Sequence, residues 1–155
     1  MTRFRPYQKS DWQPLLTVEL ETAQDALGDS TEEERATLHE RWPTRLGDQL
    51  ERTTGEIFVL ESDGGAFLGH LWLTEKRDPL NGARLLEVTS MGIARESRGQ
   101  GLGRLLMQKA ESSAREKGIA MMELSVHGNN RRARDLYRDL GYETTQRTLR
   151  KRMRD

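Results

Sequence analysis

The chain has 155 residues, with 25 Lys and Arg, 25 Asp and Glu, and no cysteine. The lack of cysteine excludes disulfides, thiolate metal sites and a cysteine acyl-enzyme. No run of apolar residues is long enough to span a membrane, and the first residues lack the apolar segment of a signal peptide. We therefore expect one cytoplasmic domain over 1–155.

The charges are divided unevenly along the chain. Residues 1–80 contain 9 Lys and Arg against 16 Asp and Glu, whereas residues 81–155 contain 16 against 9. A basic C-terminal half suits an anionic cofactor, and an acidic N-terminal half suits a cationic amine, although most single charges are expected to be solvated. Nucleic-acid binding is a weaker alternative, because the arginines near 131–138 lack aromatic stacking partners. Neither nucleic acid nor a membrane is expected as a partner.

The first elements are a short strand and a capped helix. Residues 4–7, which begin and end with an aromatic side chain, are predicted to form a short first strand. Ser10 with Gln13 matches a capping box, so a helix is predicted from there to Leu27, with Pro14 in its first turn.

A second helix follows, which a proline should interrupt. Ser30 with Glu33 repeats the capping-box pattern. The helix should stop or kink before Pro43, because proline removes a backbone hydrogen bond. A separate short helical piece is then predicted over 46–55.

A hairpin is predicted next. Strands over 57–61 and 67–74 are joined through Asp63-Gly64-Gly65, a turn signal. His70 and Trp72 share one face of the second strand. They line either the core or an acceptor site.

A glycine-rich segment carries the main functional signal. Residues 83–94 favour a strand, and they precede Arg98-Gly99-Gln100-Gly101-Leu102-Gly103 and an amphipathic helix over 102–118. Alternating glycines let backbone N–H groups approach a polyanion, and a helix start adds unpaired donors. A P-loop would need four residues between its glycines, and a dinucleotide fingerprint would need glycine where Arg104 stands. A phosphate-binding loop of another type is predicted.

A second motif lies after a strand predicted over 120–126. It reads Asn130-x-x-Ala133-x-x-Leu136-Tyr137-x-x-Leu140-Gly141-Tyr142, which combines a helical apolar stripe with a glycine stop. The last strands are predicted over 142–145 and 146–153.

Together the loop and this motif resemble the GNAT superfamily of N-acetyltransferases. The resemblance covers residues 83–145, whereas the first 80 residues match only in the order of their elements and form the variable, acceptor-side half. It implies a single N-acetyltransferase domain with an α/β fold, a three-layer α-β-α sandwich. The sheet should be mixed, partly antiparallel and splayed at its central strands. Homodimers are common in the family, but no interface is identified in this sequence.

The resemblance also implies a binding mode for acetyl-CoA as co-substrate. The backbone of Met91, Gly92 and Ile93 should run alongside pantetheine, as an added strand would. Asn130, or the adjacent Asn129, should hydrogen-bond pantetheine, and either could instead be a helix N-cap. The expected pyrophosphate contacts, mostly through N–H groups, are Arg98, Gly99, Gln100, Gly101, Leu102, Gly103 and Arg104.

Two catalytic residues are implied in the same way. Tyr137 occupies the family's tyrosine position and either protonates the departing thiolate or only packs in its helix. Glu87 lies where some members place a catalytic glutamate, and it is either a base or a carboxylate held by a neighbouring Arg or Lys. Simple alternation would put Glu87 on the same strand face as Met91 and Ile93.

The implied function is acetyl-CoA-dependent transfer of an acetyl group to a primary amine, directly in a ternary complex. The acceptor is a small-molecule amine or a protein amine. The alternative is a catalytically silent acyl-CoA-binding or regulatory domain. No metal is expected, because His39, His70 and His127 do not form a recognisable ligand set.

Overall fold

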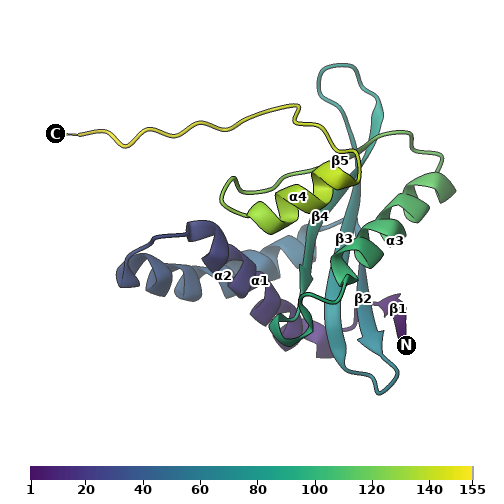
Figure 1. Cartoon of the computed structure of the whole chain (residues 1–155), viewed down its shortest axis with the longest axis horizontal. Helices are drawn as coiled ribbons and strands as arrows, with labels where there is room; N and C mark the ends of the chain where they lie inside the picture. The colour runs from purple at the N-terminus through teal and green to yellow at the C-terminus, as the bar shows by residue number, and fades with distance from the viewer. Residues whose placement is uncertain (155) are drawn as a thin grey trace.

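A computed structural model describes residues 1–154 (Figure 1). It contains one open sheet in the order β1-β2-β3-β4-β5, in which only β4 and β5 pair in parallel. The strands are β1 (Thr2–Pro6), β2 (Glu56–Ser62), β3 (Phe67–Arg77), β4 (Arg84–Ile93) and β5 (Met122–Leu124). The α-helices are α1 (Trp12–Leu27), α2 (Glu32–Arg52), α3 (Leu102–Glu116) and α4 (Arg131–Asp139), and the short 3₁₀ helices are η1 (Lys9–Asp11) and η2 (Arg95–Ser97).

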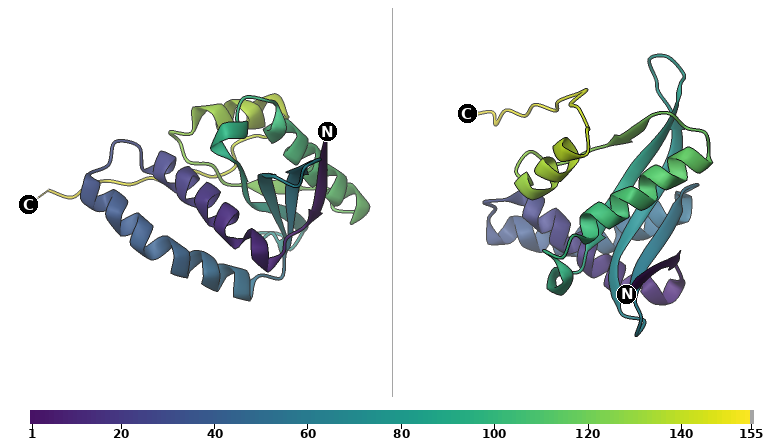
Figure 2. Two further views of the ribbon diagram at one scale, coloured as in Figure 1. Left: turned by 90° about the horizontal axis from the view of Figure 1, so that it is seen from below. Right: turned by 45° about the vertical axis from the view of Figure 1, so that its right-hand side comes forward.

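Helices cover both faces of the sheet. Figures 1 and 2 show α1 and α2 on one face and α3 and α4 on the other. One apolar cluster joins the sheet to α3, with Leu106 and Met107 fully buried at its centre. The other joins the sheet to α1 and α2 around Trp72 and Leu15, which are also fully buried. This confirms the predicted three-layer sandwich with a mixed sheet.

β4 and β5 diverge after a short contact, which is the splay that the family resemblance predicted. Their pairing covers three residue pairs and ends where Val88 lies opposite Leu124. The last five residues of β4, 89–93, therefore have a neighbouring strand on the β3 side alone. Main-chain groups on the other side form a free edge.

A bulge on β4 changes which side chains share a face. Trp72 lies opposite Ser90, but the next residue, Leu73, lies opposite Val88, so Thr89 has no partner. One extra residue reverses the alternation of side chains along a strand. Nothing in the residue types of this strand signals the bulge, and its consequence for the site is large.

The helical predictions need two corrections. The capping boxes are formed by Gln8 with Asp11, before η1 and α1, and by Thr31 with Glu34, before α2. The second helix also continues through Pro43 without a break.

Packing explains why α2 is continuous. Trp42, Leu46 and Leu50, which lie on both sides of the proline in the chain, all pack in the cluster shared with α1. Burial of this common face offsets the hydrogen bond that the proline removes.

The two strands predicted after residue 141 are absent from the described residues. Residues 142–154 form neither helix nor strand, and the yellow segment of Figure 1 extends away from the sheet. Leu149 and Met153 are 89% and 79% exposed. Tyr142 at its start packs against the core, but the apolar side chains after it are too few and too exposed to hold the rest of the segment against the sheet. None of the helices over 1–154 is long and apolar enough to cross a membrane.

Candidate active site

The glycine loop, residues 98–104, connects η2 to the start of α3. Gly99 and Gly101 have φ of 80° and 76°, a left-handed conformation that favours glycine. The first helical hydrogen bond of α3 runs from the Leu105 N–H to the Gly101 carbonyl, at 3.3 Å. Over residues 1–154, the N–H groups of 99–104 have no acceptor. The loop therefore presents a row of free donors at the positive end of a helix, which suits an anion.

The free edge of β4 adds donors next to this loop. The Ala94 N–H donates to the Leu68 carbonyl on β3, at 2.8 Å. Successive peptide groups of a strand point to opposite edges, so the N–H groups of Met91 and Ile93 point away from β3. The Gly92 N–H points towards β3. Of the three backbone positions predicted to run along a ligand, two thus offer an amide to the open edge.

Three elements meet at Gly103, in the first turn of α3. A side chain there would begin 3.2 Å from Leu136 on α4, 3.6 Å from Ile93 and 3.9 Å from Met91 on β4. The glycine therefore lets the loop, the free edge and α4 approach closely. The structure brings these separate motifs together around the start of α3.

Helix α1 passes across the gap between the diverging strands. On the β4 side, the Ser90 hydroxyl donates to the Glu19 carboxylate. On the far side, the Asn129 amide, from the loop before α4, donates to the Ala26 carbonyl at 2.9 Å. Glu19 and Ala26 lie seven positions apart, which is about 10 Å along a helix. One extended chain inserted between two strands needs about the same width.

Some polar side chains predicted in this site already have protein partners. Arg98 lies 3.5 Å from Asp25 and 3.7 Å from Glu21 on α1, and its Nε is 3.5 Å from the Ile93 carbonyl. Asn130 is the N-cap of α4, since its side chain accepts from the Ala133 N–H at 3.2 Å. Arg104 and Gln100 are exposed.

A family model decides the identity of this arrangement. Residues 17–142 match the model of the Acetyltransferase (GNAT) family. The chain belongs to the GNAT family of acetyltransferases. The match includes the glycine loop, the free edge and α4.

Individual GNAT-like proteins are similar over different shares of the chain. The N-acetyltransferase YdgE of Bacillus subtilis (strain 168), which is named as uncharacterized, is 34% identical over 94 residues. These cover 61% of this chain and 59% of that protein, less than two thirds of its length. The structure of a putative acetyl transferase from Pyrococcus furiosus has a TM-score of 0.82 at 20% identity, covering 99% and 100% of the chains. That of a Clostridium acetobutylicum acetyltransferase with acetyl-CoA has a TM-score of 0.68 at 17% identity, covering 98% and 96%. Both show the GNAT fold.

Tyr137, in the GNAT motif of α4, is half-buried against the core. Its ring lies 6.0 Å from that of Tyr142, edge to face. Burial raises the pKa of Tyr137 to about 12, so its hydroxyl carries a proton at neutral pH. Unlike the Tyr142 hydroxyl, which donates to Met122 Sδ, the Tyr137 hydroxyl has no hydrogen-bond partner over residues 1–154. It is free to contact a ligand.

The position of Glu87 differs from the prediction. The bulge at Thr89 places Glu87 on the face of β4 opposite to Met91 and Ile93. The Lys76 ammonium lies 2.7 Å from one of its oxygens, and the Thr89 hydroxyl lies 3.4 Å from the other. The alternative of a carboxylate held by a basic neighbour is thus the observed arrangement.

Sequence reasoning missed a buried polar cluster of Glu19, His70 and Ser90. His70 Nε2 lies 2.9 Å from Glu19 Oε1 and 3.0 Å from Ser90 Oγ, and the His70 side chain is 1% exposed. Burial alone would raise the pKa of Glu19, but the hydrogen bond and the electrostatic attraction from His70, together with the hydrogen bond from Ser90, outweigh it and lower the pKa. One feature of the sequence could have indicated this cluster. Glu19 lies one helical turn after Leu15 and Leu16, which are buried, so its carboxylate lies on the apolar face of α1.

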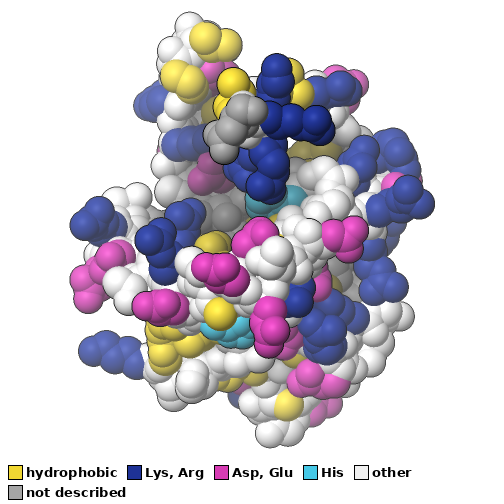
Figure 3. Space-filling view, turned by 90° about the vertical axis from the view of Figure 1, so that its left-hand side faces the viewer, with side chains coloured by type: hydrophobic (Ala, Val, Ile, Leu, Met, Phe, Trp, Pro, Cys, Tyr) yellow, Lys and Arg dark blue, Asp and Glu magenta, His cyan; other side chains and the backbone are white. Residues whose placement is uncertain are grey.

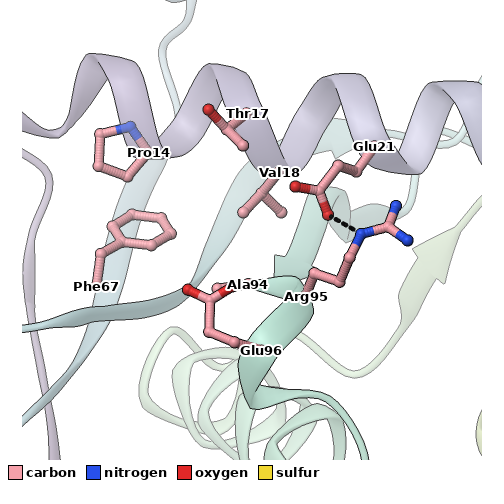
Figure 4. A pocket seen from close by; sticks show the side chains of 8 residues that line it. All are labelled: Pro14, Thr17, Val18, Glu21, Phe67, Ala94, Arg95 and Glu96. Atoms are coloured by element: carbon pink, nitrogen blue, oxygen red, sulfur yellow. Dashed lines mark hydrogen bonds and ion pairs between the residues drawn. The ribbon is translucent and has the colours of Figure 1, made fainter.

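Two cavities lie beside the site. One of about 130 Å³ separates α1 from the end of β4 (Figure 4). Its wall carries the ion pair of Glu21 with Arg95, at 3.0 Å. Another, of about 370 Å³, lies between the end of α2 and β2. Over residues 1–154 no three His, Asp or Glu side chains are grouped to hold a metal ion.

Both signs of charge lie on one side of the molecule. Figure 3 shows Asp and Glu side chains mostly across the middle of that side, and Lys and Arg side chains at its top and towards its left and right. The arginines of α4 belong to the basic half of the sequence, and the acidic residues of α1 and α2 to the other half. A ligand lying between α4 and α1 meets both signs of charge.

Proposed function

We propose that this chain is an acetyl-CoA-dependent N-acetyltransferase that moves an acetyl group directly to a primary amine of a small molecule or a protein. The row of free N–H groups over 99–104, beside the open edge of β4, carries this proposal. The row fits a pyrophosphate, and the edge fits an extended amide-containing chain of one strand's width. Acetyl-CoA has both parts in one molecule.

The number of donors is sufficient for useful affinity. A hydrogen bond from an N–H group to a charged acceptor contributes about 1.5–3 kcal/mol net. Six such bonds, one for each N–H group of the row, contribute about 9–18 kcal/mol, which after the cost of association leaves enough for roughly micromolar binding. Because these donors belong to the main chain, no particular side chain of the loop has to supply the affinity.

The reaction requires a neutral amine beside the thioester. A lysine-like amine has a pKa of about 10.4, so roughly one in two thousand is neutral at pH 7. The neutral nitrogen attacks the carbonyl carbon, a C–N bond forms and the C–S bond breaks. The β4 amides that face the gap are placed to stabilise the oxyanion. Counted from the ammonium form, the nitrogen loses two protons: one is released to solvent before attack, and the other balances the proton that the thiolate takes.

Tyr137 is the proposed acid and Glu87 the proposed base. Donation from a tyrosine with a pKa of about 12 to a thiolate of ordinary pKa, about 8.5, is uphill by roughly 5 kcal/mol. This free-energy cost is larger than that for an ordinary tyrosine, whose pKa of about 10 is close to that of a thiol. Tyr137 would therefore act through a hydrogen bond to the sulfur, which strengthens as the C–S bond breaks. Glu87 would have to exchange its contact with Lys76 for one with water or the amine.

Purified protein, acetyl-CoA and a panel of amines test the proposal. Thiol release that depends on one class of amine, with one acetylated product per thiol, is the expected result. Acetyl-CoA binding without turnover on any amine would favour the alternative, a silent acyl-CoA-binding or regulatory domain. Absence of acetyl-CoA binding by calorimetry would contradict both.

A further inference from the structure

The cluster of Glu19, His70 and Ser90 has an unused acceptor that points out of it. Both hydrogen bonds to Glu19, from His70 and from Ser90, are made to Oε1. Over residues 1–154 its Oε2 accepts none, yet it is not among the buried polar atoms without partners. The Glu19 side chain keeps 13% of its surface exposed. One oxygen is therefore anchored in the protein, and the other reaches solvent.

His70 is the one basic side chain that contacts Glu19 over residues 1–154. Its Nε2 faces Glu19 Oε1, whereas its Nδ1 is buried and has no hydrogen-bond partner. The His70 ring and the Ser90 hydroxyl thus both hold Oε1. Oε2 remains the acceptor that is available to a ligand.

The cluster lies at the start of the free edge. Ser90 directly precedes Met91, whose N–H faces the gap, and His70 pairs with Gly92 in the neighbouring strand. Gly92 itself is packed so closely that a side chain there would overlap Val18 of α1, at 2.4 Å, and would begin 3.1 Å from His70. The Glu19 carboxylate therefore flanks the gap on its α1 side, where the acyl end of the proposed ligand would lie.

We propose that Glu19, fixed by His70 and Ser90, first binds the acceptor as an ammonium ion beside the thioester, before the nitrogen loses a proton to solvent and attacks, so the acceptor is a cationic amine. This inference rests on the proposed function, since the thioester must lie in the gap. It assigns acceptor recognition to α1 and not to Glu87, whose two oxygens already face Lys76 and Thr89. An uncharged amine or a hydroxyl acceptor would leave the Glu19 charge without a partner.

Two CoA thioethers of equal size test the proposal without knowledge of the acceptor. S-(2-aminoethyl)-CoA carries an ammonium group two carbons from sulfur, and S-propyl-CoA carries a methyl group there. Calorimetry on the wild-type chain should show binding about tenfold tighter for the aminoethyl compound, the ratio expected for one charge-assisted hydrogen bond. Glu19→Gln should reduce that ratio to about one and leave the affinity for S-propyl-CoA unchanged.

The glutamine variant preserves the fold, because its amide oxygen accepts the same two hydrogen bonds. Glu40→Gln removes an equal charge from an exposed site on α2 and is the matched control. It should keep the tenfold ratio, which excludes an effect of net charge. Ser90→Ala should give an intermediate ratio, because it loosens one anchor of Glu19.

The outcomes separate the two proposals. Equal affinity of the wild type for both compounds, or an unchanged ratio in Glu19→Gln, would overturn the role of Glu19 and leave acetyl-CoA binding standing. Failure of the wild type to bind either compound would overturn the proposed function and this inference with it.

Discussion

The glycine loop and the cluster of Glu19, His70 and Ser90 flank the same strand and are built in opposite ways. The loop uses main-chain N–H groups from consecutive residues, and it is exposed. The cluster uses three side chains, from α1, β3 and β4, which hydrogen bonds join to one another. The first arrangement requires only small residues and a helix start, whereas the second requires three particular side chains brought together by the fold.

The difference suggests a division of labour along β4. A main-chain site tolerates changes of side chain and suits a ligand shared by a whole family. A side-chain site changes with single substitutions and suits the group that differs between members. The following variants test whether the loop controls affinity for acetyl-CoA and whether the side chains of the site control turnover. Those in the loop come first.

Gly101→Asp should have the largest effect. It places a carboxylate beside the row of free N–H groups, at a residue whose φ of 76° disfavours any side chain. Loss of two or more charge-assisted hydrogen bonds lowers affinity for acetyl-CoA by more than about 100-fold. Calorimetry measures the loss.

Gly118→Asp is the matched control for this variant. Gly118 lies just beyond the other end of α3, has φ of 67°, and, like Gly101, has no atom within 4 Å of the position that a Cβ would take. Its substitution carries the same backbone strain, about 1–2 kcal/mol, without approaching the loop. Equal losses of affinity in the two variants would show that strain, and not the site, explains the effect.

This contrast also explains how much could be read from the sequence. The glycine loop, the helix after it and the α4 motif are local sequence patterns. Their residues therefore predicted these elements and indicated the GNAT family correctly. The bulge at Thr89 has no such pattern, because it is set by how β3 and β4 pair. The prediction that Glu87 shares a face with Met91 and Ile93 was therefore wrong. The predicted contacts of Met91 and Ile93 with pantetheine involve main-chain groups, so they do not depend on which face the side chains occupy.

Tertiary packing accounts for the other differences. Pro43 predicted a break that the burial of Trp42 and Leu46 overrides. The strands expected after residue 141 do not form over residues 142–154, where Leu149 and Met153 are exposed, although β5 is the last strand of the sheet. Glu19 and Ser90 are distant in sequence, and no motif joins them.

Tyr137→Phe should have the next largest effect, on turnover and not on binding. Removal of the hydroxyl should lower kcat by about 100-fold if it assists the departing thiolate. The affinity for acetyl-CoA should change little, because the ring remains. Tyr142→Phe is the control, since that hydroxyl is bonded to Met122 Sδ at 3.6 Å. An unchanged kcat in Tyr137→Phe would remove its proposed role.

Glu87→Gln should have a smaller effect on turnover. Lys76 and Thr89 already contact its two oxygens, so we expect kcat to fall by only about tenfold, below the usual range for a general base. The pKa of Lys76 is raised by Glu123 and Glu87, so its ammonium stays charged and keeps the contact. Glu75→Gln, which instead loses an ion pair with Arg84, is the control. A fall of 100-fold or more would restore Glu87 as the main base.

Arg5→Met should lower the stability of the fold and leave turnover per folded molecule unchanged. Arg5 lies on β1, in the acidic N-terminal half of the chain and outside the candidate site. Its guanidinium contacts Glu61 at 2.6 Å and Asp11 at 2.8 Å, and both carboxylates are 4% exposed. Hydrogen bonds from Arg5 lower the pKa of each below its usual value, about 3.9 for Asp and 4.3 for Glu. Their contribution to stability is therefore present above those values and is lost as the pH falls through the folded-state pKa.

Urea unfolding at pH 7 and at pH 4 separates this effect from any effect on the site. The variant should be less stable than the wild type at pH 7, because two buried carboxylates lose their common partner. The difference in unfolding free energy should narrow at pH 4. There, protonation of the carboxylates removes the unpaired buried charges of the variant and begins to weaken the ion pairs of the wild type. A difference that stays constant with pH would mean that Arg5 stabilises the sheet through packing of its side-chain carbons and not through charge.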